Sequence, residues 1–351
     1  MEIKPLVIGD LIARIPVIQG GMGVGISLSG LAGNVALEGG IGIISTAQIG
    51  FREQDYDENP LSANLRAIGK EIEKARKIAQ GGILGVNIMV ATQKYEEYVK
   101  AALQAGVDII ISGAGLPMTL PALAAGFQTK LAPIVSSVKS ADVICKYWLK
   151  KYDRLPDAVI VEGPLAGGHL GFSREQLDHL DELDFDQEIK KIVETVQEYG
   201  AVKNKDIPVV AAGGIYDRAD MEHYLELGVA GVQVATRFVT TYECDAAEEY
   251  KQAYIKASKE DIVIVNSPVG MPGRAIANQF VKKAKEGPIP HGKCHACIAS
   301  CKPASTPYCI TEGLVHAAKG AVENSLLFCG ANAYRAEKIE HVKDIMREFM
   351  P

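Results

Sequence analysis

The stretch at residues 159–171 reads VIVEGPLAGGHLG. Its first residues are apolar and β-branched, which predicts a short buried strand. That strand ends in a glycine-rich loop, where Gly167 and Gly168 let the backbone come close to a ligand. His169 follows directly, and imidazole is the side chain best suited to proton exchange near neutral pH. A strand, a glycine turn and a titratable side chain in this order place chemistry at the carboxyl end of a strand in α/β enzymes.

Similar apolar runs recur on both sides of this stretch and alternate with amphipathic segments. Such alternation predicts βαβ units, and eight strands predict a closed (β/α)8 TIM barrel. The alternative is an open doubly wound sheet, but that fold gathers its glycines at one switch point, whereas glycines here follow many strands. The predicted strands are Ile15–Gln19, Ile41–Ser45, Ile83–Asn87, Asp108–Ser112, Lys130–Val135, Ala158–Val161, Pro208–Ala212 and Gly231–Ala235. The predicted helices are Leu61–Gln80, Tyr95–Ala105, Ser140–Lys151, Phe185–Tyr199 and Asp217–Leu227.

The alternation stops near residue 258. We therefore expect a barrel over 1–258, an irregular cysteine-rich capping subdomain over 259–330 and a C-terminal helix within 331–351 that packs on the barrel. Within the last part, Glu337–Phe349 has the amphipathic pattern of a helix. The acidic segment 171–190 is long for a loop of a barrel, and it is interpreted either as a solvated surface excursion or as a lid.

Composition and charge exclude several classes of protein. With 351 residues, 48% of them hydrophobic, the chain can bury a large core. A net charge of -6 argues against a nucleic-acid or anionic-membrane partner. No apolar run approaches the roughly 18 residues of a membrane span, and the N-terminus lacks the pattern of a signal peptide. An odd number of cysteines, seven, suits a reducing cytoplasm better than a secreted disulfide framework. We therefore expect a cytoplasmic protein.

Four of these cysteines lie close together in the sequence. Thiolates at such short spacing can ligate Zn²⁺ or an iron–sulfur cluster, and His291 and His295 add two further candidate ligands. The alternative is that the thiols are reduced and packed in a small subdomain. The candidate metal ligands are Cys294, Cys297, Cys301 and Cys309.

Glycines and small polar residues also follow the other strands. Gly213 and Gly214 come after the seventh predicted strand, and Ala235 and Thr236 come at the end of the eighth. Backbone N–H groups and a hydroxyl at these two strand ends are where barrels bind phosphate.

Five ordered motifs together carry a family resemblance. They are PVIQGGM at 16–22, GVN at 85–87, EGPLAGGHLG at 162–171, AAGGI at 211–215 and QVATRF at 233–238. In this combination the chain resembles the nitronate monooxygenase (2-nitropropane dioxygenase) family, which includes the flavin-dependent enoyl-acyl-carrier-protein reductases. The resemblance runs in order over about residues 1–240 and implies a TIM barrel that binds FMN.

The resemblance also implies a role for individual residues. His169 matches the active-site histidine of the family. Ala235 departs from the family, which commonly has glycine there, so clearance for the phosphate shrinks slightly. Arg237 is either a phosphate contact or a structural ion pair. The implied cofactor ligands are Gly20, Gly21 and Met22 against the flavin ring, Asn87 and Lys139 towards the flavin, Gln233 at the ribityl chain or ring edge, and Gly168, Gly213, Gly214, Ala235 and Thr236 around the phosphate.

These observations lead to a ranked set of functions. The first is nitronate monooxygenation, the oxidative denitrification of alkyl nitronates with O2, in which His169 holds the nitronate or takes the α-proton of a nitroalkane. The alternative is NAD(P)H-dependent reduction of an enoyl thioester. The third is a flavin-binding protein without catalytic activity, which an intact His169 argues against. In each case the ligand is a small molecule, and a homodimer through 260–330 is a further expectation.

Overall fold

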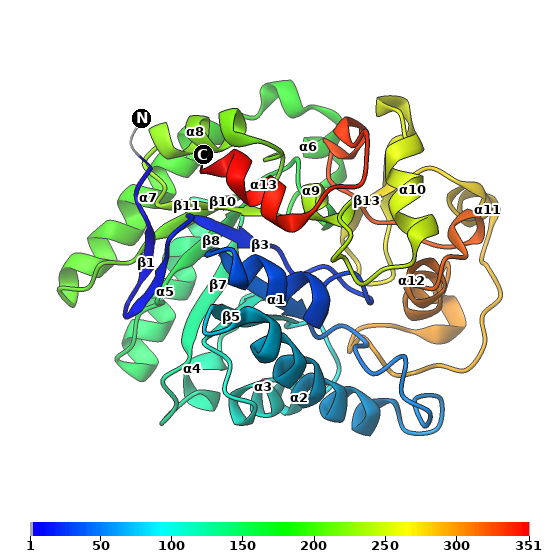
Figure 1. Cartoon of the computed structure of the whole chain (residues 1–351), viewed down its shortest axis with the longest axis horizontal. Helices are drawn as coiled ribbons and strands as arrows, with labels where there is room; N and C mark the ends of the chain where they lie inside the picture. Colours follow the sequence, from blue (N-terminus) through cyan, green and yellow to red (C-terminus); the bar gives the residue numbers. More distant parts are fainter. Residues whose placement is uncertain (1–2, 351) are drawn as a thin grey trace.

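The computed structural model describes residues 3–350, and its centre is a closed barrel of eight parallel strands (Figure 1). The barrel closes because β8 pairs with β10 on one side and β3 pairs with β11 on the other. All eight predicted strands are present, which confirms the (β/α)8 fold. In neighbour order the strands are β10 (Val209–Ala212), β11 (Gly231–Val234), β3 (Val17–Gln19), β4 (Ile41–Ser45), β5 (Ile83–Met89), β6 (Ile109–Gly113), β7 (Lys130–Val135) and β8 (Val159–Glu162).

Helices surround the barrel, and the five predicted from the sequence are confirmed to within a few residues. Two of them begin at capping boxes that the sequence encodes: Ser137 with Ser140 for α5, and Asp217 with Asp220 for α8. The helices of the barrel region are α1 (Ser29–Leu37), α2 (Pro60–Ala79), α3 (Tyr95–Gln104), α4 (Leu120–Leu123), α5 (Val138–Tyr152), α7 (Phe185–Val202), α8 (Arg218–Glu226), α9 (Thr236–Val239) and α10 (Glu248–Lys256).

An antiparallel hairpin that was not predicted from the sequence closes the N-terminal end of the barrel. It consists of β1 (Leu6–Ile8) and β2 (Leu11–Ala13). Leu6 and Ile8 are fully buried in one cluster with the inward-facing isoleucines and alanines of the barrel strands. Strands of three residues are too short for a periodicity to be read, so this plug follows from the tertiary structure alone.

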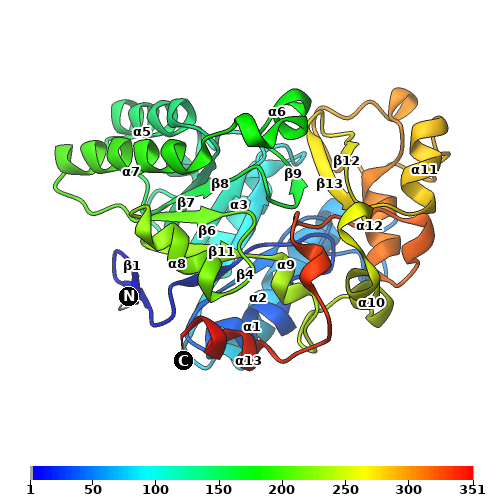
Figure 2. The same ribbon diagram turned by 90° about the horizontal axis from the view of Figure 1, so that it is seen from above.

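The C-terminal subdomain is attached to the barrel through a shared sheet. β12 (Ile262–Asn266) and β13 (Pro272–Ile276) form a hairpin, and β13 also pairs with β9 (Gly168–His169), which belongs to the glycine-rich loop after β8. Figure 2 shows this sheet between the barrel and the helices α11 (Gln279–Glu286) and α12 (Ile310–Ala318). The chain thus links the loop that carries His169 directly to the subdomain.

The acidic segment 171–190 and the C-terminal helix can be compared with their predictions. The acidic segment 171–190 contains the short helix α6 (Arg174–Asp178), and its Leu177 packs beside Leu170 while most of its acidic side chains are exposed. The last helix, α13, spans Val342–Phe349, and it packs against α1 and α8. It therefore begins five residues after the predicted start at Glu337, because residues 337–341 are irregular, with an isolated bridge between Glu340 and Thr241.

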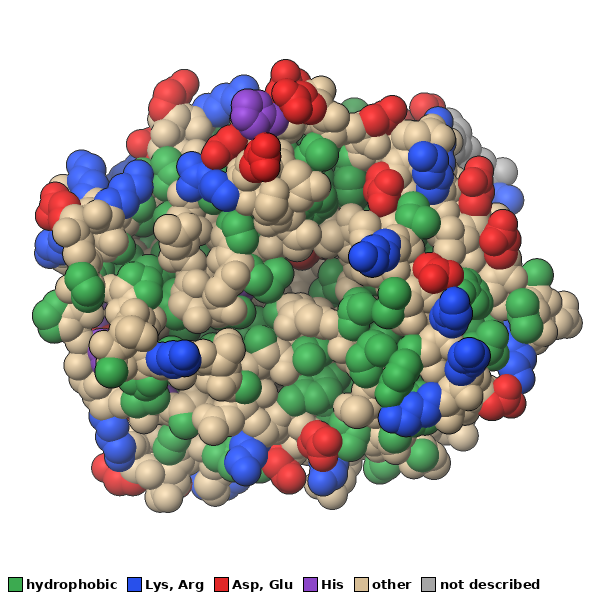
Figure 3. Space-filling view, turned by 180° about the vertical axis from the view of Figure 1, so that it is seen from behind, with side chains coloured by type: hydrophobic (Ala, Val, Ile, Leu, Met, Phe, Trp, Pro, Cys, Tyr) green, Lys and Arg blue, Asp and Glu red, His purple; other side chains and the backbone are tan. Residues whose placement is uncertain are grey.

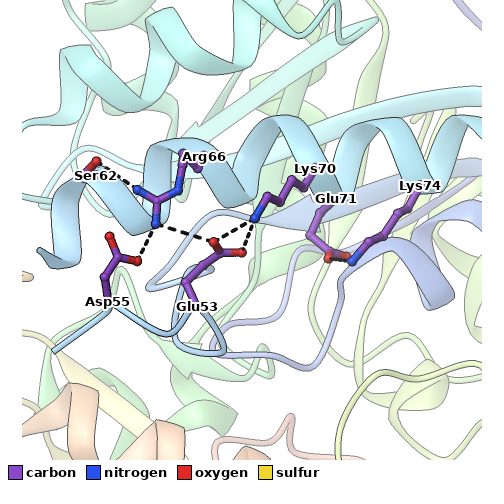
Figure 4. Close-up of polar contacts among 7 residues, drawn as sticks. All are labelled: Glu53, Asp55, Ser62, Arg66, Lys70, Glu71 and Lys74. Atoms are coloured by element: carbon purple, nitrogen blue, oxygen red, sulfur yellow. Dashed lines mark hydrogen bonds and ion pairs between the residues drawn. The ribbon is translucent and has the colours of Figure 1, made fainter.

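Charged side chains are spread over the surface. On the face seen in Figure 3, hydrophobic side chains gather near the middle, and acidic and basic ones are interspersed around them. Figure 4 shows one such group, in which Arg66 pairs with Glu53 and Asp55 while Lys70 pairs with Glu53 at 2.8 Å. Within residues 3–350, no helix has both the length and the apolar character needed to cross a membrane.

Candidate functional site

A cavity of about 410 Å³ lies at the carboxyl ends of the barrel strands. Its walls come from the loops after β3, β5, β8, β10 and β11, and from the C-terminal subdomain, including Ile298, Ile310 and Phe328. This is the end of the barrel at which enzymes of this fold carry their active sites, and the volume is in the range of small-molecule sites.

The floor of the cavity is the last inward-facing layer of the barrel. Side chains alternate along a strand, so Glu162 shares the inward face of β8 with the buried Ile160, and Asn87 and Gln233 occupy the corresponding positions on β5 and β11. All three line the cavity. Oε1 of Gln233 is buried and has no hydrogen-bond partner among residues 3–350. A buried amide oxygen without a partner is costly, so this atom calls for a donor from a ligand.

The predicted phosphate ligands form a second wall, which we call the cradle and define as Gly213, Gly214, Ala235 and Thr236. Both glycines have positive φ angles, +97° and +84°, which an L side chain rarely adopts. The Thr236 hydroxyl accepts a hydrogen bond from the Gly330 N–H at 2.9 Å. No acceptor for its own proton occurs among the described residues, so that proton is free for a ligand.

The segment around residue 330 completes the cradle. Asn332 donates its Nδ2 hydrogen to the Gly214 carbonyl at 2.6 Å. The Tyr216 hydroxyl is buried, lines the same wall and has no partner among residues 3–350. Neither Tyr216 nor Asn332 was predicted as a site residue. Asn332 could not be predicted, because only the tertiary structure brings the C-terminal segment to the loop after β10.

Gly20, Gly21 and Met22 lie between the cradle and the floor. A Cβ atom on Gly20 would be 3.1 Å from the Cβ of Ala235, and a Cβ on Gly21 would collide with Asn87. Glycine is therefore required where the loop after β3 passes between two other strand ends. The structure brings all three residues to the cavity together with Asn87, Gln233, Gly168 and the cradle.

His169 lines the cavity from the side of the shared sheet. Its Nε2 lies 2.7 Å from Oγ of Ser267, and its ring meets the Phe328 ring edge-on with centroids 5.0 Å apart. Burial lowers the pKa of His169 to about 4, because a charged imidazolium is poorly solvated in this position. The ring is therefore neutral near pH 7. A neutral imidazole with a low pKa is a hydrogen-bond donor rather than a strong base.

Glu162 is the ionisable residue of the floor. Burial raises the pKa of this carboxyl to about 7, and no cation compensates for the loss of hydration. A carboxyl group with a pKa near 7 can supply a proton under physiological conditions. From the sequence, Glu162 was noted only as the first residue of the EGPLAGGHLG motif, directly after the predicted strand Ala158–Val161. Its inward orientation, which the strand alternation implies, is the signal that identifies it as a site residue.

Two of the predicted site residues lie elsewhere. Lys139, which was interpreted either as a polar residue towards the flavin or as the start of a helix, is exposed at the start of α5 and does not line the cavity. The reason is that the chain turns into a helix at Ser137, which directs Lys139 away from the barrel mouth. Arg237 forms ion pairs with Glu340 and, at 3.2 Å, with Glu348. Of the two alternatives for Arg237, a phosphate contact or a structural ion pair, the structure shows the ion pair.

The predicted metal site is not formed. Among residues 3–350, no three His, Cys, Asp or Glu side chains are grouped so that they can hold a metal ion. The cysteines have different surroundings: Cys294 is exposed, and Cys297 lines the cavity. The two histidines are engaged elsewhere, since His295 binds Asp57 at 2.9 Å and His291 bonds two backbone carbonyl groups. All four candidate ligands are free thiols in a largely irregular segment.

Comparisons with known proteins place this site in a class. A barrel whose strand ends combine a backbone cradle, a polar floor and one histidine is typical of flavin-dependent oxidoreductases. A model of the family described as nitronate monooxygenase matches residues 5–351, and the chain belongs to that family. The resemblance seen in the motifs is thereby confirmed, and the protein is a flavin-dependent oxidoreductase.

Individual relatives agree with this assignment. The chain is 27% identical over 308 residues to a probable nitronate monooxygenase of Staphylococcus saprophyticus, with 82% of each chain covered. A second relative is the Mycobacterium tuberculosis 5-hydroxy-7a-methyl-1-oxo-octahydro-1H-indene-4-carboxyl-CoA dehydrogenase. The chain is 26% identical to it over 272 residues, which cover 78% of this chain and 66% of the relative. The solved structure of FabK from Thermotoga maritima superposes with a TM-score of 0.72 at 25% identity, covering 95% of this chain and 91% of that one.

Proposed function

We propose that the protein is an FMN-dependent nitronate monooxygenase that converts alkyl nitronates and O2 into carbonyl compounds and nitrite. In balanced form, two nitronate anions and one O2 give two carbonyl compounds and two nitrite ions. When bound, FMN supplies the one-electron chemistry that links the nitronate to O2. The protein binds and orients the reactants and stabilises their charge.

The residues of the cavity fit FMN. The cradle offers backbone N–H groups and the free Thr236 proton to a phosphate, and the positive φ angles of its glycines leave no side chain in the way. Gly20, Gly21 and Met22 would lie along the flat ring. Asn87 and the unpaired Oε1 of Gln233 would meet polar groups of the cofactor at the floor. Gly168 would complete the phosphate end of the site.

The observation that carries the choice of reaction is the neutral state of His169. A nitronate is already an anion, so it needs neither a base to remove a proton nor an acid to supply one. An N–H donor on the cavity wall stabilises its oxygens, and a ring with a pKa of about 4 stays neutral and keeps that donor throughout the neutral range.

An anaerobic reduction experiment tests this proposal. The FMN-loaded protein is mixed with ethyl nitronate in the absence of O2 and pyridine nucleotide, and the flavin absorbance is followed. We expect bleaching or a semiquinone spectrum, and we expect acetaldehyde and nitrite after O2 is admitted. A flavin spectrum that stays oxidised with every nitronate tried contradicts the proposal.

Enoyl-thioester reduction is the second candidate, and two observations favour it. The part of the cavity under the subdomain is apolar, with Met89, Ile298 and Leu314 in its wall, which suits an acyl chain. Glu162, whose pKa is about 7, is able to give a proton to the α-carbon after hydride reaches the β-carbon. Bleaching by NADH or NADPH, followed by reoxidation with crotonyl thioester, would select this reaction.

A further inference from the structure

The hydroxyl group of Ser267 reaches the catalytic histidine from the other part of the chain. Ser267 begins the turn between β12 and β13, and it stands 98 positions from His169 in the sequence. Antiparallel pairing of Gly273 with His169 and of Arg274 with Gly168 sets the register that brings the two side chains together. The contact is therefore built into the shared sheet rather than into a loose loop.

The turn itself holds Ser267 in place. Its N–H donates to the Met271 carbonyl at 3.3 Å, and its carbonyl accepts from the Gly270 N–H at 2.9 Å. Its side chain accepts from the Val269 N–H at 3.3 Å. Ser267 is only 8% exposed, and it does not line the cavity. It thus acts on His169 and not on a bound ligand.

The hydrogen-bond inventory decides the direction of the contact. A serine hydroxyl has one proton, and the Val269 N–H already uses it as an acceptor. Among residues 3–350, Nε2 of His169 is the one acceptor recorded for that proton, at 2.7 Å. If Nε2 carried hydrogen instead, the buried serine proton would be left without a partner, which is costly. Ser267 therefore donates, and Nε2 accepts.

We infer that Ser267 is a positioning residue that holds His169 in the tautomer with its proton on Nδ1. That nitrogen has no partner among the described residues and is not a fully buried atom, so its N–H is the group that the ring offers to a substrate oxygen. Phe328 fixes the plane of the ring from the side. The same bond occupies Nε2, which leaves the histidine a donor rather than a base.

The tautomer can be measured without turnover, by long-range ¹H–¹⁵N NMR on protein labelled at its histidine ring nitrogens. His169→Gln identifies the signals. We expect a protonated Nδ1 and an unprotonated Nε2 in the native protein, and the loss of this preference in Ser267→Ala. Ser267→Thr, which keeps the hydroxyl, should preserve it. Asn266→Ala, at the exposed neighbouring position, is the matched control and should leave the ring signals unchanged.

Two results overturn the inference: a native ring protonated on Nε2, or a Ser267→Ala ring that still carries its proton on Nδ1. The first needs no variant, so the test survives if Ser267→Ala fails to fold. With ethyl nitronate, which rests on the proposed function, we expect Ser267→Ala to lower kcat about ten-fold with unchanged FMN affinity, and Ser267→Thr to restore it. An inactive native enzyme with the expected tautomer would contradict the proposed reaction and leave the assignment of Ser267 intact.

Discussion

The cradle and a second wall of the cavity are built by different means. The cradle, Gly213, Gly214, Ala235 and Thr236, presents mostly backbone, and its geometry comes from two adjacent barrel strands. The second wall, which we call the roof and define as His169, β12, β13 and Phe328, presents side chains and is held by an antiparallel sheet and a small apolar cluster. On the proposed function, the backbone donors of the cradle would hold the phosphate, whereas the side chains of the roof would decide which reaction follows. Cofactor binding and chemistry should therefore be separable by mutation.

The largest effect is expected at the roof. His169→Ala removes the donor that faces the substrate, and we expect kcat/KM for ethyl nitronate to fall about 100- to 1,000-fold, as for the loss of an oxyanion donor. The amount of FMN bound should not change, because the cradle is untouched. Steady-state kinetics and the flavin content of the purified variant provide the measurement. His179→Ala, an exposed histidine ten residues further on, is the control. Loss of FMN from His169→Ala would break the proposed separation.

The second-largest effect is expected at Glu162 in the floor of the cavity, and it concerns the free energy of unfolding. The pKa of Glu162 is about 7 in the folded protein and 4.5 ordinarily, so the folded state keeps a proton that the unfolded chain loses between these values. The free energy of unfolding therefore falls as the pH rises from about 4.5 to 7, by about 3 kcal/mol, and stays low above pH 7. Glu162→Gln should abolish this fall. Urea denaturation of the cofactor-free protein at pH 5 and pH 8 measures it.

Glu194→Gln, an exposed carboxyl on α7, is the matched control for Glu162→Gln, and it should behave like the native protein at both pH values. If Glu162→Gln retains the full pH dependence of the native protein, the carboxyl of the floor is not the group responsible.

Two glycines allow the cradle to be compared with the roof: Gly214 belongs to the cradle, and Gly270 lies in the turn between β12 and β13. Gly214 and Gly270 have similar positive φ angles, +84° and +89°, so alanine costs about 1–2 kcal/mol of backbone strain at each. A Cβ atom on Gly214 would also come within 2.9 Å of the Leu165 side chain at the cavity, whereas one on Gly270 meets nothing within 4 Å. We expect Gly214→Ala to weaken FMN binding about ten-fold and Gly270→Ala to leave it unchanged. Equal FMN affinities, measured by fluorescence titration, would contradict this.

The smallest effect is expected far from both walls. Arg66 is 41% exposed and pairs with Glu53 and Asp55, and Lys70 keeps its own pair with Glu53 when Arg66 is replaced. Arg66→Met should lower the free energy of unfolding by less than about 1 kcal/mol, and added salt should reduce the difference. FMN binding and turnover should stay at native values. Urea denaturation at low and high ionic strength measures the effect, and a loss above that bound would show that this group does more than cover the surface.

The barrel was predictable because the sequence signals of its strands and helices come from residues that are close together in the chain. Most strands are short β-branched runs followed by glycine or a small residue, and eight such runs alternate with five recognisable amphipathic helices. Errors at single boundaries therefore do not change the fold. The same regularity placed Gly213, Thr236, Asn87 and His169 at one end of the barrel. For Lys139 the sequence left two alternatives open, a polar residue towards the flavin or the start of a helix, and the structure places it in the first turn of α5.

The roof was not predictable to the same depth. Residues 259–330 were predicted to be irregular, and nothing in the order of residues indicates that β13 pairs with β9. The cysteine spacing suggested a metal site, yet the side chains of an irregular segment take their directions from packing rather than from a period. Cys294 is exposed while Cys297 lines the cavity, three positions away.

By itself the sequence determined the (β/α)8 barrel, the family and the strand ends at which we propose that FMN binds, because strand alternation and glycine positions are properties of neighbouring residues. Only the tertiary structure decided which ring nitrogen of His169 is available, since that depends on Ser267, 98 positions away. It also decided that Glu162 is buried without a cation and that Gln233 lacks a partner. Burial and hydrogen bonding depend on contacts between distant segments, and these contacts exist only once the chain is folded.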